Sequence, residues 1–179
     1  LYNFANTHRG TYTQSIPDVA SFYNSFSGYM DELAWAAAWL HRATGESNYL
    51  ADAEAHFAMA SPDPNWAHSW DGKINGTACL LAAMTGKPQY IAAMETHLNY
   101  WQPGGGISYT PGGLAWLDTW GSLRYAANTS FLAFAYASMV GDPDGKYQAF
   151  GEQQINYILG NNPRNSSYVC GFGNNPPTR

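Results

Sequence analysis

The chain has 179 residues, a formal net charge of −5 and a charged fraction of only 12%. It has no cluster of Lys and Arg, which argues against nucleic acid or an anionic membrane surface as a partner, and no apolar run long enough to span a bilayer. Aromatic residues make up 16% of the sequence, with 7 Trp and 13 Tyr. One core does not readily bury so many, so we expect some of them to face a ligand.

Apolar residues at helical spacing predict six main helices in three consecutive pairs. Their segments are Gly28–Gly45, Glu46–Met59, Ser69–Gly86, Lys87–Trp101, Gly121–Gly141 and Asp144–Gly160. Four of the segments end on a glycine, the residue that most readily closes a helix. Ser47 is the expected N-cap of the second helix, and Pro88 is expected in the first turn of the fourth, where its missing N–H costs little. The opening residues read as the last turns of a further helix, closed by Gly10.

Long segments rich in aromatic residues, Gly and Pro join these helices. They are Thr11–Ser27, Ala60–Trp70, Gln102–Trp120 and Asn161–Arg179. Within the third of them, Gly106–Gly113 is compatible with a short hairpin arm. Helical hairpins with short turns on one side and long loops on the other predict an all-α fold, an α/α toroid, with a solenoid as the competing architecture. Toroids commonly place their chemistry in the long loops at one end.

No short sequence motif identifies a reaction or a ligand by itself. There is no GxSxG elbow and no glycine-rich phosphate-binding loop. Cys79 and Cys170 are too far apart in sequence to suggest a disulfide scaffold, and they lack CxxC spacing. N-glycosylation patterns at Asn75, Asn128 and Asn165 are weak evidence for secretion.

The first cluster of functional interest is Phe22–Glu32. A Ser27–Gly28 turn leads directly into a helix that has Asp31 and Glu32 in its first turn. Acidic residues favour the positive end of the helix dipole, so capping is one interpretation. Adjacent carboxylates and loop carbonyls are also the hard oxygen ligands that Ca²⁺ prefers. The residue chemistry alone favours capping.

The second cluster is Asn65–Lys73, where Trp66, His68 and Trp70 crowd a loop that ends at Asp71. It reads either as a packed loop with Asp71 as an N-cap or as a sugar platform, because the face of a Trp ring stacks on the apolar face of a pyranose. His68 reads as a hydrogen-bonded structural residue, since no second His lies at ligand spacing.

The third cluster is Gly112–Ser130, in which Trp116 and Trp120 lie on either side of an aspartate. Arg124 and Tyr125 follow Trp120 by about one helical turn and are therefore able to share a surface with it. Core packing and an interhelical ion pair explain these residues as well as carbohydrate contact does. The 13 acidic residues show no spacing that marks a catalytic pair.

The three clusters, in this order, resemble glycoside hydrolase family nine, the inverting cellulases built on an (α/α)₆ barrel. The blocks that carry the resemblance are Phe22–Gly45, Leu117–Ala137 and Ile155–Arg179. The last block is long and specific, and the resemblance covers essentially the whole chain.

The resemblance implies a structural calcium ion. Ser27 and Gly28 match the family's calcium-binding carbonyl groups, and Asp31, Glu32 and Asp71 match its carboxylate ligands. This match reverses the preference for capping that the residue chemistry alone supports.

The resemblance also implies substrate-binding residues for cellulose or cello-oligosaccharides. Tyr23 and Trp66 match stacking platforms on the non-reducing side of the cleft, and Trp120 matches a platform just beyond the scissile bond. Arg124 and Tyr125 match hydrogen-bonding residues of the cleft. Phe26 stands where a Trp is common, which implies a weaker outermost subsite and makes Phe26 a further candidate contact.

The activity implied is that of a secreted endo-β-1,4-glucanase that cleaves internal bonds of cellulose by inversion. No catalytic residue is assigned within the chain, because the family's catalytic base and acid lie in blocks that the chain does not contain. Both ends look truncated, so we expect about half of a barrel. The isolated chain is expected to be inactive and either to self-associate or to need the rest of its domain.

Two alternatives remain, of which the first belongs to a different class of protein. One is a non-catalytic glycan-binding helical module that never had the catalytic carboxylates. The other is an α/α-toroid enzyme that acts on a different polysaccharide.

Overall fold

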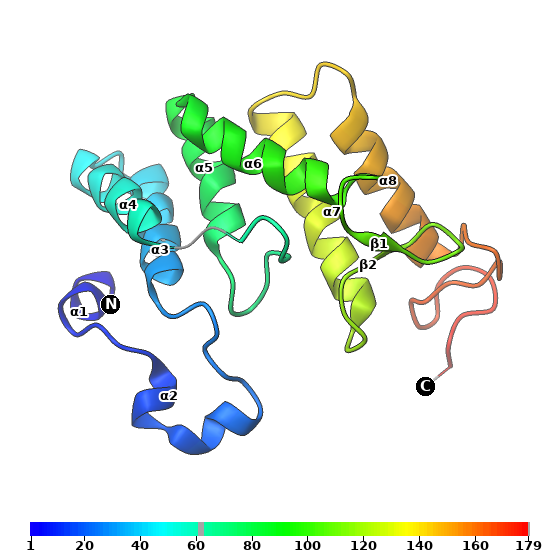
Figure 1. The fold of residues 1–179 in the computed structure, drawn as a ribbon, viewed down its shortest axis with the longest axis horizontal. Helices are drawn as coiled ribbons and strands as arrows, with labels where there is room; N and C mark the ends of the chain where they lie inside the picture. Colours follow the sequence, from blue (N-terminus) through cyan, green and yellow to red (C-terminus); the bar gives the residue numbers. More distant parts are fainter. Residues whose placement is uncertain (61–62, 179) are drawn as a thin grey trace. The chain divides into compact units, whose positions relative to one another are not determined.

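The computed structural model describes residues 1–60 and 63–178, which fold mainly as helices (Figure 1). The chain divides into two compact units. The N-terminal unit comprises Leu1–Asp63 and His68–Met94, and the C-terminal unit comprises Pro64–Ala67 and Glu95–Arg179. The prediction of an all-α fold is confirmed.

The N-terminal unit is built on three packed helices. Its elements are α1 (Tyr2–Thr7), α2 (Tyr12–Ser15), the 3₁₀ helix η1 (Pro17–Ser21), α3 (Met30–Thr44), α4 (Ser47–Met59), α5 (Ile74–Thr85) and the first part of α6 (Pro88–Trp101). Helix α3 packs against both α4 and α5. Ala34, Ala37 and Ala38 on α3 are completely buried, and their small side chains allow the neighbouring helices to approach closely.

Glycine closes two of the helices of this unit, α3 and α5. Gly45 and Gly86 close α3 and α5 in the left-handed conformation, with φ of 76° and 63°, which a residue without Cβ adopts at little cost. The expected N-cap of α4 is wrong by one residue, because Glu46 precedes the helix and Ser47 is its first residue. The predicted end of α1 is also wrong, since the helix stops at Thr7, before Gly10.

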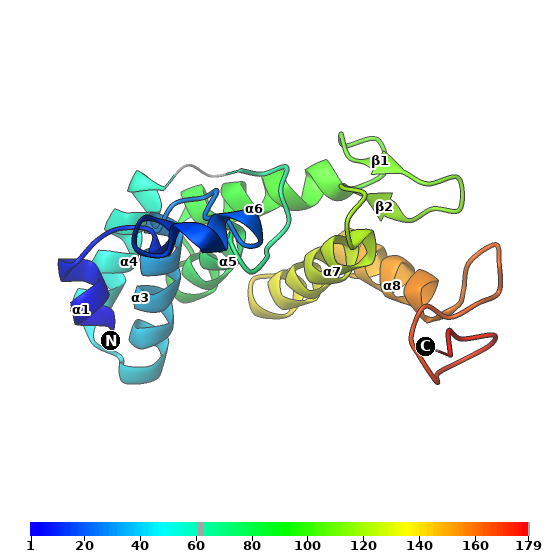
Figure 2. The same cartoon turned by 90° about the horizontal axis from the view of Figure 1, so that it is seen from below.

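The C-terminal unit contains a long helical hairpin. Helices α7 (Ser122–Met139) and α8 (Lys146–Leu159) lie side by side (Figures 1 and 2). Gly151 on α8 allows this close packing, because a Cβ there would lie 2.9 Å from the ring of Phe134 on α7. Gly160 closes α8 as predicted, whereas α7 ends two residues before Gly141.

A short antiparallel hairpin precedes α7. Strands β1 (Ser108–Tyr109) and β2 (Ala115–Trp116) pair Ser108 with Trp116 and Tyr109 with Ala115. The predicted arm is therefore present, although its second strand lies beyond the stretch expected to form it. We call residues 107–116 the arm.

The prediction of three helical pairs holds for α3 with α4 and for α7 with α8. The third pair differs, because α5 packs on α3 and α6 is shared between the two units. The first half of α6 approaches α4, where the Tyr90 ring lies 5.2 Å from that of Phe57. No helix among the described residues has the length and apolar character needed to cross a membrane. Cys79, which is buried, and Cys170, which is exposed, are both free.

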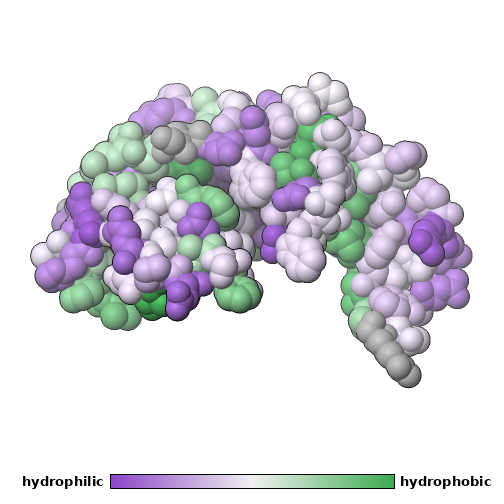
Figure 3. Space-filling view, turned by 60° about the horizontal axis from the view of Figure 1, so that its bottom comes forward, coloured by the Kyte–Doolittle hydropathy of each residue, from purple (hydrophilic) through white to green (hydrophobic). Residues whose placement is uncertain are grey.

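Apolar side chains reach the surface at several places (Figure 3). Phe22, Phe26 and Trp120 are 82%, 77% and 79% exposed, which confirms that not all of the aromatic residues are buried. Self-association of the isolated chain stays a prediction.

Gly105 provides a test of the backbone geometry at the base of the arm. A Cβ at this position would lie 1.9 Å from the carbonyl oxygen of Asn99, and a backbone atom cannot rotate away. Gly105→Ala should therefore destabilise the protein by about 1–3 kcal/mol, lowering the thermal midpoint by several degrees. Gly10→Ala is the matched control, because its Cβ would approach only the flexible Gln14 side chain. Equal melting curves for the two variants would contradict the assigned turn.

Candidate functional site

The loop before α3 carries the predicted carbonyl ligands. Gly28 has a φ of +88°, so the turn into the helix requires a glycine. Its carbonyl oxygen accepts a hydrogen bond from Ser25 Oγ at 2.7 Å. The loop is thus partly fixed by its own side chain.

Asp71 ties this loop to the segment before α5. Its carboxylate accepts hydrogen bonds from the backbone N–H groups of Phe26, at 3.1 and 3.2 Å, and Ser27, at 3.0 Å. In return, Ser27 Oγ donates to the Asp71 carbonyl oxygen at 3.1 Å. Asp71 is nearly buried and bonds to the loop backbone. It does not cap α5, whose N-cap is Lys73.

Asp31 and Glu32 lie beside one another in the first turn of α3. Asp31 is buried and its Oδ2 accepts a hydrogen bond from the backbone N–H of Lys73 at 2.7 Å. Within the described part of the chain, Asp31 Oδ1 and Glu32 Oε2 are buried without a hydrogen-bond partner. Burial, together with the adjacent Asp31 carboxyl group, raises the pKa of Glu32 to about 8.

Lys73 is a basic residue whose charge acts on Glu32, and its ammonium group is hydrogen-bonded to the backbone. Lys73 Nζ donates to the carbonyl oxygens of Trp70, at 2.6 Å, and Ser69. Burial lowers the pKa of Lys73, although the neighbouring acids oppose that shift. The positive charge of Lys73 therefore lies near the carboxylates without forming a hydrogen bond to either orphaned oxygen.

The side chains alone do not assemble a metal cage. No group of three or more His, Cys, Asp or Glu side chains in residues 1–60 and 63–178 is arranged to hold a metal ion. A calcium site here would need the backbone carbonyls of Ser27 and Gly28 in addition to carboxylates. The two unpartnered carboxylate oxygens fit such a site chemically, because Ca²⁺ takes six to eight oxygen ligands. Calcium stays a prediction.

His68 is a packing residue. Its ring lies 5.1 Å from that of Trp35, and a Cβ on Gly76 would come within 2.7 Å of it. Burial, and then the charge of Lys73, lowers the pKa of His68 to about 4. It is therefore neutral at ordinary pH, in agreement with the structural role expected from the sequence.

The N-terminal unit presents two of the predicted sugar contacts. Tyr23 and Phe26 are 60% and 77% exposed. The Tyr23 ring meets Trp70 edge-to-face at 5.3 Å, and Tyr12 donates its hydroxyl to the Tyr23 carbonyl oxygen at 2.5 Å. Sequence reasoning did not single out this support of Tyr23 by Trp70.

The C-terminal unit brings together three of the predicted contacts. The ring of Trp66 lies 5.5 Å from that of Tyr125. Arg124 Nη2 donates a 2.6 Å hydrogen bond to the Tyr125 hydroxyl group, and its guanidinium carbon lies 4.6 Å from the centre of the Tyr125 ring. Tyr125 is buried, whereas Trp66 and Arg124 remain exposed. Trp120, at the entrance to α7, is also exposed.

His97, which sequence reasoning missed, anchors the loop that carries Trp66. It is completely buried on α6, and its Nδ1 lies 2.8 Å from the Pro64 carbonyl oxygen. A carbonyl accepts hydrogen bonds only, so the geometry assigns the Nδ1 proton to this contact. The bond fixes the backbone two residues before Trp66.

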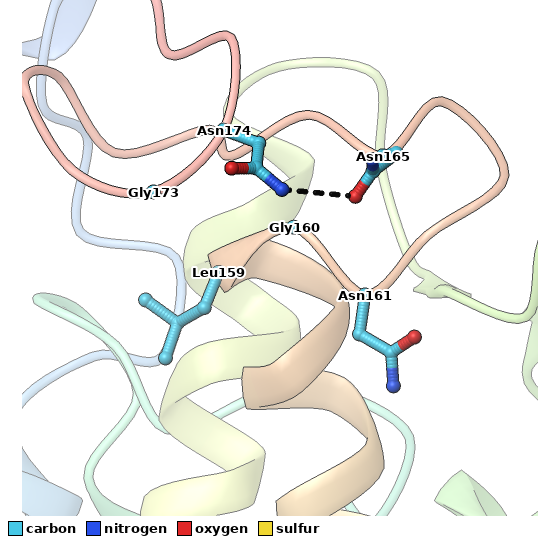
Figure 4. A pocket seen from close by; sticks show the side chains of 6 residues that line it. All are labelled: Leu159, Gly160, Asn161, Asn165, Gly173 and Asn174. Carbon is cyan, nitrogen blue, oxygen red and sulfur yellow. Dashed lines mark hydrogen bonds between the residues drawn. The ribbon is translucent and has the colours of Figure 1, made fainter.

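A separate polar pocket of about 330 Å³ lies beyond the C-terminal end of α8 (Figure 4). Its lining residues are Leu159, Gly160, Asn161, Asn165, Gly173 and Asn174. Asn174 Nδ2 donates to Asn165 Oδ1 at 3.3 Å across it. None of the predicted site residues lines this pocket.

Comparison with known proteins identifies the family. The model of glycosyl hydrolase family 9 matches residues 1–179. The chain belongs to this family. Endoglucanase B of Cellulomonas fimi is 48% identical over 190 residues, which cover 99% of this chain and 18% of that protein. Endoglucanase A of Bacillus pumilus is 47% identical, and the match covers 99% of this chain and 28% of that protein.

Solved structures of family 9 enzymes share the fold. Endoglucanase CelQ of Clostridium thermocellum complexed with cellotetraose has a TM-score of 0.93 and 46% identity over 98% of this chain and 31% of that chain. The endoglucanase of the termite Nasutitermes takasagoensis has a TM-score of 0.89 and 42% identity, and the match covers 99% of this chain and 40% of that chain. The family 9 fold is an (α/α)₆ barrel, of which these helices form a part. The chain thus spans well under half the length of these relatives.

The role of His97 can be tested through the loop that it anchors. His97→Leu should raise amide hydrogen exchange in residues 65–67 several-fold, because a hydrogen bond of about 1 kcal/mol is lost. His97→Asn, whose side-chain amide can donate from nearly the same place, should restore much of the protection. His41→Leu is the control, since His41 Nδ1 also bonds to a backbone carbonyl, 2.8 Å away at Glu46. Unchanged exchange in His97→Leu would refute the anchor.

Proposed function

We propose that the protein containing these residues is an endo-β-1,4-glucanase that hydrolyses cellulose with inversion, and that this segment binds the glucan chain and calcium. The observation that carries the proposal is the cluster of Trp66, Tyr125 and Arg124. It combines an exposed indole ring with a hydrogen-bonded, pre-positioned polar pair. The names of the family 9 relatives, which are endoglucanases, and the cello-oligosaccharides in the CelQ complexes support it.

The proposed binding follows from the shape of a glucan chain. Each pyranose has apolar faces that stack on an aromatic ring and a rim of hydroxyl groups that require hydrogen bonds. Trp66 and Trp120 supply exposed rings, and Arg124 supplies donors in a fixed plane. Tyr125 holds the Arg124 guanidinium group in place before the sugar arrives, so less freedom is lost on binding.

Tyr23 and Phe26 provide further stacking surface in the N-terminal unit. A phenylalanine offers a smaller face than the tryptophan common at its position in the family. We therefore expect the outermost subsite to bind sugar weakly.

Inverting hydrolysis needs two carboxyl groups on opposite faces of the scissile bond, one acting as acid and one as base. We propose that neither lies within residues 1–179, because the family's catalytic blocks lie outside them. The acids Asp31 and Asp71, which are buried, and Glu32, which is half-buried, contact loop backbone or each other, which suits a structural role. Cellulose is an extracellular polymer, so we also propose that the protein is secreted.

The proposed calcium ion would be held by the carbonyls of Ser27 and Gly28 and the carboxylates of Asp31, Glu32 and Asp71. Its chemistry there is structural, since it would supply the positive partner that the orphaned carboxylate oxygens lack. The residues themselves join the loop before α3 to the start of α5. This loop also carries Phe26, so the metal site and the outer stacking surface are linked through the backbone.

The proposed reaction is tested on the protein that contains this chain. Cellohexaose hydrolysis followed by NMR should show the α-anomer first at the new reducing end. Trp66→Ala should raise KM for long cello-oligosaccharides roughly 2- to 10-fold, because one stacking contact is worth about 0.5–1.5 kcal/mol.

Trp39→Ala is the matched control, because Trp39 is an exposed tryptophan of α3 that we do not place in the site. The isolated 179-residue chain should show no turnover. A β-anomeric first product, or turnover by the chain alone that depends on one of its own acids, would refute the assignment.

Calcium should raise the thermal midpoint, and a chelator should lower it. Asp31→Asn should abolish most of this difference, because it removes a ligand charge while an amide oxygen can still accept the hydrogen bond from Lys73. Asp142→Asn is the control, since Asp142 also accepts two backbone N–H bonds, from Tyr147 and Gln148 at 2.9 Å each. Calcium-independent melting of the unmutated protein would contradict the calcium site and leave Asp31 and Asp71 with only their hydrogen bonds to the loop backbone.

A further inference from the structure

Gln154 forms an unusual contact for a buried side chain. It lies on α8 and is completely buried. Its Oε1 accepts a hydrogen bond from the backbone N–H of Ala115 at 2.7 Å, and its Nε2 donates to the Gly113 carbonyl oxygen at 3.0 Å. The side-chain amide thus pairs with the backbone of the arm as a neighbouring strand would.

The arm needs such support because it is small. Two strands of two residues each are not stable alone in water. On the other strand, the Tyr109 hydroxyl group donates to the Trp101 carbonyl oxygen at 2.6 Å. The apolar side chains of Ile107 and Leu114 are buried. Gln154 supplies the polar contacts that fix the second strand in one register.

The register decides which way Trp116 points. Successive side chains of a strand face opposite sides, and Ala115 is completely buried while Trp116 is 37% exposed. By holding Ala115 against α8, Gln154 keeps Trp116 on the outer side. Trp120 follows four residues later and is 79% exposed.

The short segment between the two tryptophans is also ordered. Asp118 Oδ1 accepts hydrogen bonds from the backbone N–H and the hydroxyl group of Thr119, at 2.5 and 3.1 Å. Gly121, with a φ of 63°, then starts α7. A displacement of the arm would therefore also move Trp120, because the three residues between Trp116 and Trp120 leave little conformational freedom.

We propose that Trp116 is an additional glucan-contacting residue beside Trp120, and that Gln154 is the positioning residue that orients both by clamping the arm. This inference rests on the proposed glucanase function. The ligand class is a β-1,4-linked glucan long enough to extend past the Trp120 platform.

The experiment is a double-mutant cycle in the protein that contains this chain. Trp116→Ala should raise KM for cellohexaose roughly 2- to 10-fold with little change in kcat, because only uniform binding is lost. Gln154→Met, which keeps side-chain length but cannot pair with the backbone, should raise KM at least as much. Once Trp116 is gone, Gln154→Met should add less than it does alone, because part of its effect acts through Trp116.

The control is Gln153→Met, which changes the neighbouring exposed glutamine of the same helix and should leave KM unchanged. Gln154→Glu retains the acceptor for Ala115 but places a second carboxylate oxygen against the Gly113 carbonyl, which it repels, so it should raise KM as well. If Gln154→Met does not fold, the KM values of Trp116→Ala and Gln154→Glu still test whether Trp116 contacts glucan and whether Gln154 positions it.

The outcomes separate the two proposals. Failure of the unmutated protein to cleave cellohexaose would defeat the glucanase function. Normal cleavage, with KM unaffected by Trp116→Ala or with fully additive effects of the two substitutions, would defeat this inference alone.

Discussion

The main physical constraint on this chain is that long loops must satisfy their backbone N–H and C=O groups without a helix or a sheet to do it. Most of the aromatic candidates lie on such loops. The protein solves the problem with a few buried polar side chains that reach from one segment to the backbone of another. Those with the clearest geometry are Asp71, His97 and Gln154. Asp71 and Gln154 satisfy the polar atoms of their side chains through these contacts, and His97 does so at Nδ1, which lowers the number of buried polar groups left unpaired.

These contacts are suited to the proposed role of the exposed aromatic rings as sugar platforms. An exposed ring on a slack loop would lose much of its stacking energy to ordering when a sugar binds. Trp66 lies two residues after Pro64, whose carbonyl oxygen bonds to a histidine of α6. Trp116 directly follows Ala115, whose backbone N–H bonds to a glutamine of α8. The rigid helices thus set the positions of rings that lie outside them. In the proposed function, glucan binding by these rings therefore depends on the packing of His97 and Gln154.

The helices were largely predictable because their signals are local. Apolar spacing and the glycines at positions 45, 86 and 160 fix elements within one or two turns. The prediction of Ser47 as an N-cap was wrong because serine is also tolerated as the first helical residue when no cap hydrogen bond forms. The anchors were not predictable, since Gln154 and His97 look like ordinary polar positions of amphipathic helices. Their partners lie 39 and 33 residues away in sequence, and only the tertiary fold pairs them.

Asp71, which holds the loop before α3, can carry a charge, whereas Gln154, which holds the arm, cannot. In the N-terminal unit the loop before α3 is held by Asp71, beside buried Asp31 and half-buried Glu32. Desolvation and the neighbouring Asp31 carboxyl group raise the pKa of Glu32. Adjacent carboxyl groups that are withdrawn from water favour a proton or a cation between them, so we expect the proposed calcium ion and the protonation of Glu32 to act on this loop. Gln154 carries no charge at any pH, and its contacts with the arm do not change with protonation. Metal and pH should therefore act on the loop before α3 directly and leave the arm beside α8 unaffected.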